Sequence, residues 1–320
     1  MALSKVQVPA LGVGSLGSNL IINGDFRISQ RGDYSSATSV TNDQKYMDRW
    51  TTRFSGVTAN IQAILGTNSS PGYPYTDSNS LRLTATSSAT GILRHLQRVE
   101  GFLDGQTLTF SAWVKSNSAN ARLFQYQHNG GTRVASAAHS GGGGWEFLSV
   151  TVENNATTGN QLYFDAAIGT ASFGTLSITS GQYIEISQVQ LEVRDAPSPF
   201  MYRSIGEELA LCQRYFQVLG GTGNNYPLAS GFTSTSGFFG YGKLIRTMRG
   251  SPSFSHSGSA SHFSYTHAAV SANASSSPTF GTNPNTYYLS ISSSTTTTNN
   301  AGAYARITNS GTLAFFDSEL

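Results

Sequence analysis

Aromatic side chains are the most informative candidates for ligand recognition in this 320-residue chain, which contains 15 Tyr, 18 Phe and 3 Trp. A sugar ring presents an apolar C–H face that can stack on such side chains, while polar neighbours hold its hydroxyls. Trp113 stands out because it lies on the otherwise polar face of a predicted strand. The predicted ligand-binding residues are Trp113, Tyr126, Tyr241, Tyr287 and Tyr288. A loop-borne aromatic patch can equally be a subunit interface, so both interpretations stay open.

Acidic residues could bind a metal ion or act in catalysis, and four of them are close in sequence: Asp25, Asp33, Asp43 and Asp48. Calcium takes several carboxylate and carbonyl oxygens. Aspartate also nucleates turns through its own backbone, and this second interpretation is favoured. A glycosidase would need two carboxylates about 5–10 Å apart. The 17 acidic residues are scattered and predict no such pair.

Sequence motifs of common catalytic sites are missing. The six His residues have neither H-x-x-x-H nor H-E-x-x-H spacing. The chain has no G-x-S-x-G motif and no P-loop. Cys212 is the single cysteine, and its position on an apolar stripe predicts a buried small hydrophobe rather than a nucleophile. We therefore predict that the protein is not an enzyme.

Charge and hydropathy exclude two classes of partner. The formal net charge is +2, only 11% of residues are charged, and Lys and Arg form no cluster. Nucleic-acid binding needs a basic face that neutralises phosphates, so none is predicted. No apolar run approaches the ~20 residues of a membrane-spanning helix, so we expect no membrane insertion.

The elements that must position these residues are predicted to be mainly β-strands. Gly, Ser, Thr and aromatic residues are plentiful, and Gly/Asn turns separate short strand patterns. In Leu108–Val114 the side chains of Leu108, Phe110, Ala112 and Val114 alternate with polar ones. This spacing predicts an antiparallel jelly-roll β-sandwich, one connecting helix and a smaller C-terminal β-rich domain.

Four segments follow from these patterns. Residues 1–18 predict an extended N-terminal docking peptide. We expect the jelly-roll sandwich at residues 19–202 and the connecting helix at residues 203–221. We expect the C-terminal β domain at residues 222–320. The last segment has many hydroxyl residues and few large aliphatic ones, so we expect a thin core that other copies of the chain complete.

The connecting helix carries the strongest local signal. Ser204 and Glu207 form a capping box, in which each side chain bonds to the backbone N–H of the other residue. The helical periodicity gives one apolar stripe through Cys212 and a second one through Leu211, Tyr215 and Val218. Because one short helix with two apolar stripes needs two packing partners, the second stripe predicts an oligomer interface.

The order of several segments resembles a recurrent module of tailed-bacteriophage virion proteins, seen in tail fibres, whose core is similar to the jelly roll of carbohydrate-binding modules. The resemblance covers roughly residues 19–217. The segments are NLIINGDFRISQRG (Asn19–Gly32), DRW (Asp48–Trp50), TFSAWVKS (Thr109–Ser116), GWEFLSVTV (Gly144–Val152) and IEISQVQLEV followed by SPFMYRSIGEELALCQRYFQ (Ile184–Gln217).

The resemblance implies a structural protein of the virion, made in the cytoplasm of a bacterial host. It implies a short tail fibre or receptor-binding subunit, expected to be a homotrimer, that attaches to host surface polysaccharide. The N-terminal peptide would bind other virion proteins. Carbohydrate-binding modules often hold a structural calcium ion, for which Asp25 is the best candidate; no other cofactor is expected. A head fibre, a capsid decoration or a baseplate-associated protein is the alternative, and a polysaccharide depolymerase is less favoured.

Overall fold

A computed structural model describes residues 19–65, 79–100, 105–126, 133–154, 162–221, 225–268, 270–295 and 297–319. The chain divides into two compact units, Met1–Glu208 and Leu209–Leu320. The docking peptide predicted at 1–18 lies outside the described residues. None of the helices in the described ranges is both long and apolar enough to cross a membrane.

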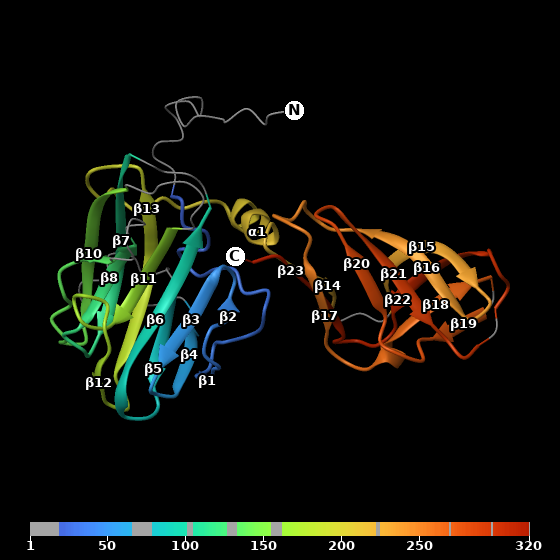
Figure 1. The fold of residues 1–320 in the computed structure, drawn as a ribbon, viewed down its shortest axis with the longest axis horizontal. Helices are drawn as coiled ribbons and strands as arrows, with labels where there is room; N and C mark the ends of the chain where they lie inside the picture. Colours follow the sequence, from blue (N-terminus) through green and yellow to red (C-terminus); the bar gives the residue numbers. More distant parts are fainter. Residues whose placement is uncertain are drawn as a thin grey trace. The chain divides into compact units, whose positions relative to one another are not determined.

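Unit 1 is an antiparallel β-sandwich, as predicted (Figure 1). One sheet has the strand order β1-β4-β5-β13-β7-β10. Its strands are β1 (Thr38–Ser39), β4 (Ala59–Ile64), β5 (Ser80–Ala85), β13 (Tyr183–Glu192), β7 (Gln106–Ser116) and β10 (Trp145–Asn154). The second sheet has the order β2-β3-β6-β11-β8-β9, and β12 also pairs with β6. Its strands are β2 (Gln44–Met47), β3 (Trp50–Ser55), β6 (Ala89–Val99), β11 (Leu162–Ile168), β8 (Ala121–Tyr126), β9 (Arg133–Ala135) and β12 (Leu176–Ile178).

The core of unit 1 lies between its two sheets and follows the predicted alternation. On β7 the side chains of Leu108, Phe110, Ala112 and Val114 are fully buried. The ring of Phe110 meets that of Phe164 on β11 at 5.3 Å between centroids, which joins the two sheets. Burying each such large apolar side chain contributes roughly 1.5–3 kcal/mol. The intervening residues of β7 therefore face away from the core.

The first described residues of unit 1 dock against β13. The Asn19 side chain accepts hydrogen bonds from the backbone N–H groups of Ile21 and Leu191, each at 3.0 Å, and donates to the Val189 carbonyl at 3.0 Å. The Val189 N–H in turn donates to the Gly24 carbonyl at 2.8 Å. Two segments about 170 positions apart in sequence thus form one structure, which explains why their motifs occur together.

A buried ion pair extends this contact to the end of unit 1. Arg203 donates to the Glu208 carboxylate at 3.0 Å and to the Ile21 carbonyl at 3.0 Å. The same carboxylate accepts from the backbone N–H of Asn23. Glu208 is almost fully buried, so its charge depends on these partners.

Helix α1 (Ile205–Gln213) begins where predicted. The Ser204 N–H donates to the Glu207 carboxylate at 3.0 Å, and the Glu207 N–H donates to the Ser204 hydroxyl at 3.2 Å, which confirms the capping box. The helix is shorter than the predicted 203–221. It closes with tighter bonds from the N–H groups of Arg214 and Tyr215 to the third preceding carbonyl, and the chain then enters a strand.

Unit 2 consists of two antiparallel sheets (Figure 1). A three-stranded sheet has the order β14 (Phe216–Gly220), β23 (Leu313–Asp317) and β17 (Ser253–His256). A seven-stranded sheet has the order β19 (Val270–Asn273), β18 (Phe263–His267), β22 (Gly302–Ile307), β15 (Tyr226–Ser234), β16 (Gly237–Lys243), β21 (Thr286–Ser292) and β20 (Thr279–Thr282). A single 3-10 turn, η3 (Ala260–His262), precedes β18.

The core of unit 2 is continuous rather than thin. Aromatic side chains supply the volume that the few large aliphatic ones do not. Phe316 is fully buried and meets the rings of Phe254, Phe280 and Tyr287 at 5.4, 5.9 and 4.9 Å. The expectation of a thin core that other copies of the chain complete is therefore wrong, because the side chains of one chain fill this core.

Candidate functional site

The site begins with a bulge in β13. The pairing of β13 with β7 shifts between Ser187 and Gln190, so β13 has one extra residue here, with Gln188 and Val189 opposite a single residue of β7. Gln188 has a φ angle of 49°, which is a left-handed conformation unusual for a residue other than glycine. The N–H of Val189 leaves the sheet ladder and bonds to Gly24. Bulges of this kind redirect side chains, and here Gln188 and Gln190 line a pocket.

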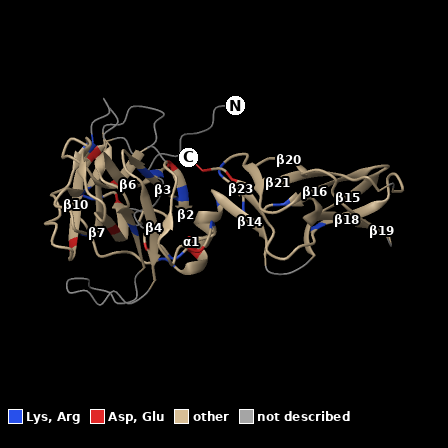
Figure 2. Ribbon diagram, turned by 90° about the horizontal axis from the view of Figure 1, so that it is seen from below, with Lys and Arg blue, Asp and Glu red and all other residues tan. Residues whose placement is uncertain are grey.

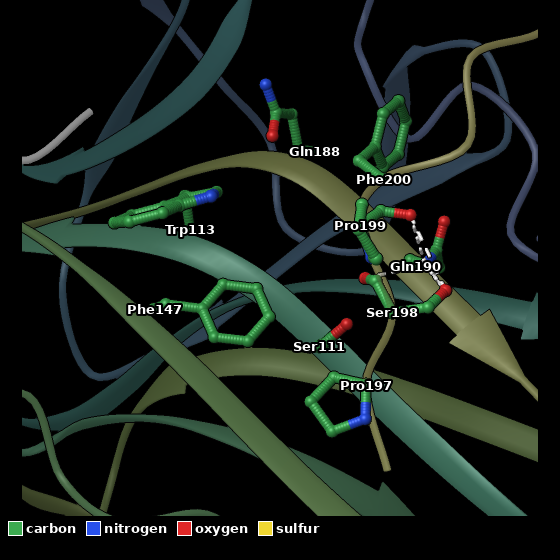
Figure 3. A pocket seen from close by; sticks show the side chains of 9 residues that line it. All are labelled: Ser111, Trp113, Phe147, Gln188, Gln190, Pro197, Ser198, Pro199 and Phe200. Atoms are coloured by element: carbon green, nitrogen blue, oxygen red, sulfur yellow. Dashed lines mark hydrogen bonds between the residues drawn. The ribbon is translucent and has the colours of Figure 1, made fainter. Parts of the chain in front are cut away.

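This pocket is a groove of about 370 Å³ on unit 1 (Figure 3). Its lining comes from β7, β10, β13 and the segment that follows β13. The lining residues are Ser111, Trp113, Phe147, Gln188, Gln190, Pro197, Ser198, Pro199 and Phe200. Figure 3 shows the rings of Trp113 and Phe147 on one side and the 197–200 segment on the other.

The aromatic wall follows directly from strand alternation. Ala112 and Val114 face the core, so Trp113 points to the opposite face of the sheet. Phe147 lies directly across from Trp113 in the β7–β10 pairing. The two rings are 5.5 Å apart between centroids at an interplanar angle of 59°. The side chain of Phe147 is 43% exposed, so this wall presents ring surface to the solvent.

The opposite wall is fixed to the sheet by Gln190. Its side-chain amide donates to the Ser198 and Pro199 carbonyls at 3.3 and 3.4 Å and accepts from the Met201 N–H at 2.8 Å. Glu192 adds a bond from the Ser198 N–H at 3.0 Å. These contacts hold Pro197 and Pro199, whose rings have little conformational freedom, beside the aromatic wall. The groove is therefore preformed.

The lining of the groove is uncharged. It offers ring faces for stacking, and amides and hydroxyls that can both donate and accept hydrogen bonds. None of its nine residues carries a carboxylate, imidazole, amine, guanidinium or thiol group. This combination suits recognition of a neutral polyhydroxylated ring, since an apolar surface with a few polar groups gives both affinity and orientation.

Of the predicted ligand-binding residues, only Trp113 lies in this groove. Tyr126 is at the end of β8, in the other sheet of the sandwich. Its ring meets the edge of Tyr163 at 5.7 Å, and the guanidinium of Arg133 lies 5.0 Å from its centroid. Tyr126 and Trp113 thus do not form one site.

The predicted tyrosines of unit 2 separate into two environments. Tyr241 and Tyr288 meet at 5.5 Å between ring centroids on the solvent side of the seven-stranded sheet. Tyr287 faces the core, is 2% exposed and donates its hydroxyl to the Leu228 carbonyl at 2.6 Å. Burial raises the pKa of the Tyr287 hydroxyl. The prediction that Tyr287 binds a ligand is wrong, because every second side chain of β21, including that of Tyr287, faces the core.

Asp25 is buried beside an arginine. It is 2% exposed and accepts an ion-pairing hydrogen bond from Arg27, while its Oδ1 has no hydrogen-bond partner. Burial raises the pKa of the Asp25 carboxyl, against the opposing effect of Arg27. Across the described ranges, no three His, Cys, Asp or Glu side chains gather as a metal site would require. A calcium ion at Asp25 stays a prediction.

The three predicted interface residues do not share a helical stripe. Leu211 is half-buried on α1, and Tyr215 is buried just after the helix ends. Val218 lies on β14, where it pairs with Phe315 of β23. The correction is physical: residues 216–220 alternate with period two and find a strand partner about 100 residues later. Whether these residues contact another copy stays a prediction.

Sequence analysis missed most of the groove. Phe147 carried a signal like that of Trp113, since it shares the outer face of β10 with Ser149 and Thr151 while the alternate residues Leu148 and Val150 are core. Gln188 and Gln190 carried no such signal, because the bulge that directs them depends on contacts with residues 19–24. The segment 197–200 gave no signal of a binding wall and entered the sequence analysis only as part of the motif series.

No protein-family model matches the chain, and no curated protein sequence matches it. Solved structures show partial similarity. The enzymatically active domain of tailspike protein 4 from bacteriophage CBA120 aligns with a TM-score of 0.34 and 15% identity over 55% of this chain. This alignment covers 21% of the tailspike chain.

Two carbohydrate-binding modules also align with unit-sized parts of the chain. TmCBM61, solved in complex with β-1,4-galactotriose, aligns with a TM-score of 0.32 and 14% identity over 56% of this chain and 100% of its own. A family 11 module from Clostridium thermocellum, solved with a β-1,3-1,4-mixed-linked tetrasaccharide, aligns with a TM-score of 0.27 and 14% identity. This alignment includes 49% of this chain and 97% of the family 11 module.

Proposed function

We propose that unit 1 is a glycan-binding module and that its ligand lies in the groove between Trp113 and the 197–200 segment. The observation that carries this proposal is the pair of half-buried Trp113 and exposed Phe147 beside an uncharged lining of amides and hydroxyls. Stacking on the rings supplies affinity for the apolar face of a sugar, and polar groups of the lining, such as the Gln188 amide, orient its hydroxyls.

A binding role fits the groove better than catalysis does. Hydrolysis of a glycosidic bond needs an acid and a base or nucleophile on either side of the bond. The groove residues supply neither. A preformed wall held by Gln190 and Glu192 lowers the ordering cost of binding, which is the property that a recognition site needs.

For the whole chain we propose a virion protein, namely a short tail fibre or receptor-binding subunit that attaches to host surface glycan. Support comes from the ordered motif series. Three of its segments meet around Asn19, Val189 and Glu208, so the motifs mark one structural unit rather than unrelated short matches. A head fibre, a capsid decoration or a baseplate-associated protein is the alternative, and labelling the subunit with a gold-conjugated antibody on intact particles distinguishes these positions.

The groove is tested by titration calorimetry of the full chain with a panel of neutral oligosaccharides. With a ligand found, Trp113→Ala should weaken binding roughly tenfold or more, because stacking is lost. Phe147→Ala should act in the same direction. Tyr126→Ala is the matched control on the other sheet and should leave the affinity unchanged. Equal affinities for the Trp113→Ala variant and the unaltered protein would refute a ligand in this groove.

A further inference from the structure

The seven-stranded sheet of unit 2 has one face in the core and one in solvent. On β16, Phe238 and Gly240 face the core side, so Phe239, Tyr241 and Lys243 point outward. Neighbouring strands add outward residues in register with these. The aromatic face consists of Phe232, Phe239, Tyr241, Tyr288 and Tyr304.

Ring contacts join four of these side chains into one surface. The centroids of Phe232 and Phe239 are 6.0 Å apart, and those of Phe239 and Tyr288 are 6.1 Å apart. Tyr288 also meets Tyr241 at 5.5 Å. Tyr241, Phe232 and Tyr304 are 67%, 47% and 42% exposed, respectively. Large exposed aromatic groups in contact with one another usually mark a binding surface.

The strand register spaces the tyrosine rings along a row. Tyr304 pairs with Ser230, which pairs with Tyr241, which pairs with Tyr288. Tyr304 and Tyr241 are thus two strands apart, about 10 Å at the usual spacing. The Ser230 hydroxyl lies between them. A row of separated rings with a hydroxyl between them matches an extended chain of sugar units, each with a flat C–H face and peripheral hydroxyls.

Glycines keep the outer rings uncovered. Gly302 is the cross-strand neighbour of Phe232, and Gly281 is that of Tyr288. Both glycines are exposed, and a Cβ on Gly302 would meet no atom within 4 Å. Because no side chain stands beside these rings at those positions, a flat ligand can approach them.

Basic residues flank the tyrosine row without an acidic partner. Arg306 lies two residues beyond Tyr304, and its guanidinium reaches only neutral hydroxyls, those of Ser264 and Ser271 at 3.3 Å and that of Tyr304 at 3.5 Å. Lys243 lies two residues beyond Tyr241 and is exposed. Among the described ion pairs, neither cation is matched with a carboxylate.

Unit 2 has few acidic residues that could pair with Arg306 and Lys243, so an anion from outside the unit is the expected partner of these two cations. Leu209–Leu320 contains five Lys and Arg residues and two acidic residues. Both acidic residues, Asp317 and Glu319, fall at the C-terminal end of the chain, at and after β23 of the other sheet (Figure 2). Packing this face against the same face of a second copy would bring the cations together with no acid to compensate them.

We propose that the aromatic face of unit 2 binds an acidic saccharide, a sugar chain that carries carboxylates. The rings of Tyr304, Tyr241 and Tyr288 stack on successive sugar faces. Arg306 and Lys243 pair with the carboxylates along one side. This site shares no residue with the groove in unit 1, whose lining is uncharged. The two proposals can therefore be tested separately.

The test uses the full chain and oligogalacturonate, with the fully methyl-esterified form as the uncharged probe of the same backbone. Binding is measured by titration calorimetry at low and at moderate salt. We expect Tyr241→Ala and Arg306→Gln each to weaken binding roughly tenfold, and methyl esterification to do the same. Added salt should lower the affinity of the unaltered protein for oligogalacturonate more than it lowers that of the Arg306→Gln variant. Trp113→Ala, in the other unit, should bind oligogalacturonate normally.

A matched control is Arg214→Gln, which removes one exposed positive charge of the same unit outside the sheet. If Arg214→Gln weakens binding as much as Arg306→Gln does, the saccharide is attracted by the overall positive charge of unit 2. The proposed site would then not exist. If Tyr241→Ala retains full affinity but lowers the mass measured by light scattering, the face is an interface between copies and the proposal is wrong. Absence of binding to oligogalacturonate and to alginate alike would also overturn it.

Discussion

Asn19 shows how much of the fold depends on single side chains. Its amide bonds to three backbone groups on two segments, and the carbonyl of nearby Gly24 accepts a hydrogen bond from the N–H of Val189 in the bulge. Trp113 and Phe147 were within reach of sequence reasoning because strand alternation alone places them on the outer face of the sheet. Gln188 was not, because it belongs to a bulge in which the next N–H, that of Val189, bonds to Gly24 far away in sequence.

Gly24 should tolerate no side chain. A Cβ there would overlap the carbonyl oxygen of Val189. We expect Gly24→Ala to lower the free energy of unfolding of unit 1 by about 1–3 kcal/mol, the usual cost of forcing atoms into a packed site. Urea denaturation followed by tryptophan fluorescence measures this. Gly144→Ala, where a Cβ meets nothing within 4 Å, is the control and should unfold like the parent protein.

Helix α1 illustrates what local sequence decides and what it does not. Its start is set by Ser204 and Glu207, which are three residues apart, so the sequence predicts it correctly. Its end is set by the pairing of β14 with β23, which lies nearly 100 residues later. Helical periodicity over 214–219 was therefore a coincidence of spacing, overridden by a tertiary partner.

The capping box should make the helix start sensitive to acid. Hydrogen bonds from the Ser204 hydroxyl and backbone lower the pKa of the Glu207 carboxyl below its ordinary value of 4.5. A lowered folded-state pKa means that Glu207 stabilises the fold fully above pH 4.5 and loses this contribution as the pH falls through the lowered value.

Denaturation of the parent protein and of Glu207→Gln between pH 7 and pH 2 measures this effect. The parent protein should be the more stable one at neutral pH, and the difference should shrink toward the acid end. Ser204→Ala should remove most of the pH-dependent difference, since the carboxylate then loses its main partner. A difference that is constant across the whole range would contradict the role of the carboxylate.

At the scale of the whole molecule, the two units have separate cores, which include Phe110 in unit 1 and Phe316 in unit 2. The mainly β fold and its sandwich could be predicted, because period-two patterns are local. The continuous core of unit 2 could not, because a count of aliphatic residues ignores the volume that Phe254, Phe280 and Phe316 supply together.

Separate cores should give two thermal transitions in calorimetry. Phe110→Ala and Phe316→Ala each remove a fully buried ring and should cost about 3–5 kcal/mol. Each variant should lower the temperature of one transition and leave the other in place. A single transition that both variants shift equally would show instead that the two units unfold together.

Assembly is a separate prediction for the whole molecule. Light scattering of the purified chain should give three times the mass of one chain. Leu211→Asp, which places a charge on the half-buried side of α1, should lower that mass more than it lowers the thermal stability of unit 1. A monomer at micromolar concentration, or an unchanged trimer in this variant, would remove the proposed role of Leu211.

The bonds that join Asn19 to Val189 and Asn23 to Glu208 also have a consequence for biosynthesis. The first residues of the sandwich cannot take their final places until the ribosome has made the last ones. At about 5–20 residues per second this wait lasts roughly 10–40 s, and further until residue 208 clears the exit tunnel. During that time β5 and β7 lack their shared partner β13. The nascent chain is therefore exposed to aggregation and to proteases for most of its synthesis, and closure of unit 1 is a late event in the life of each molecule.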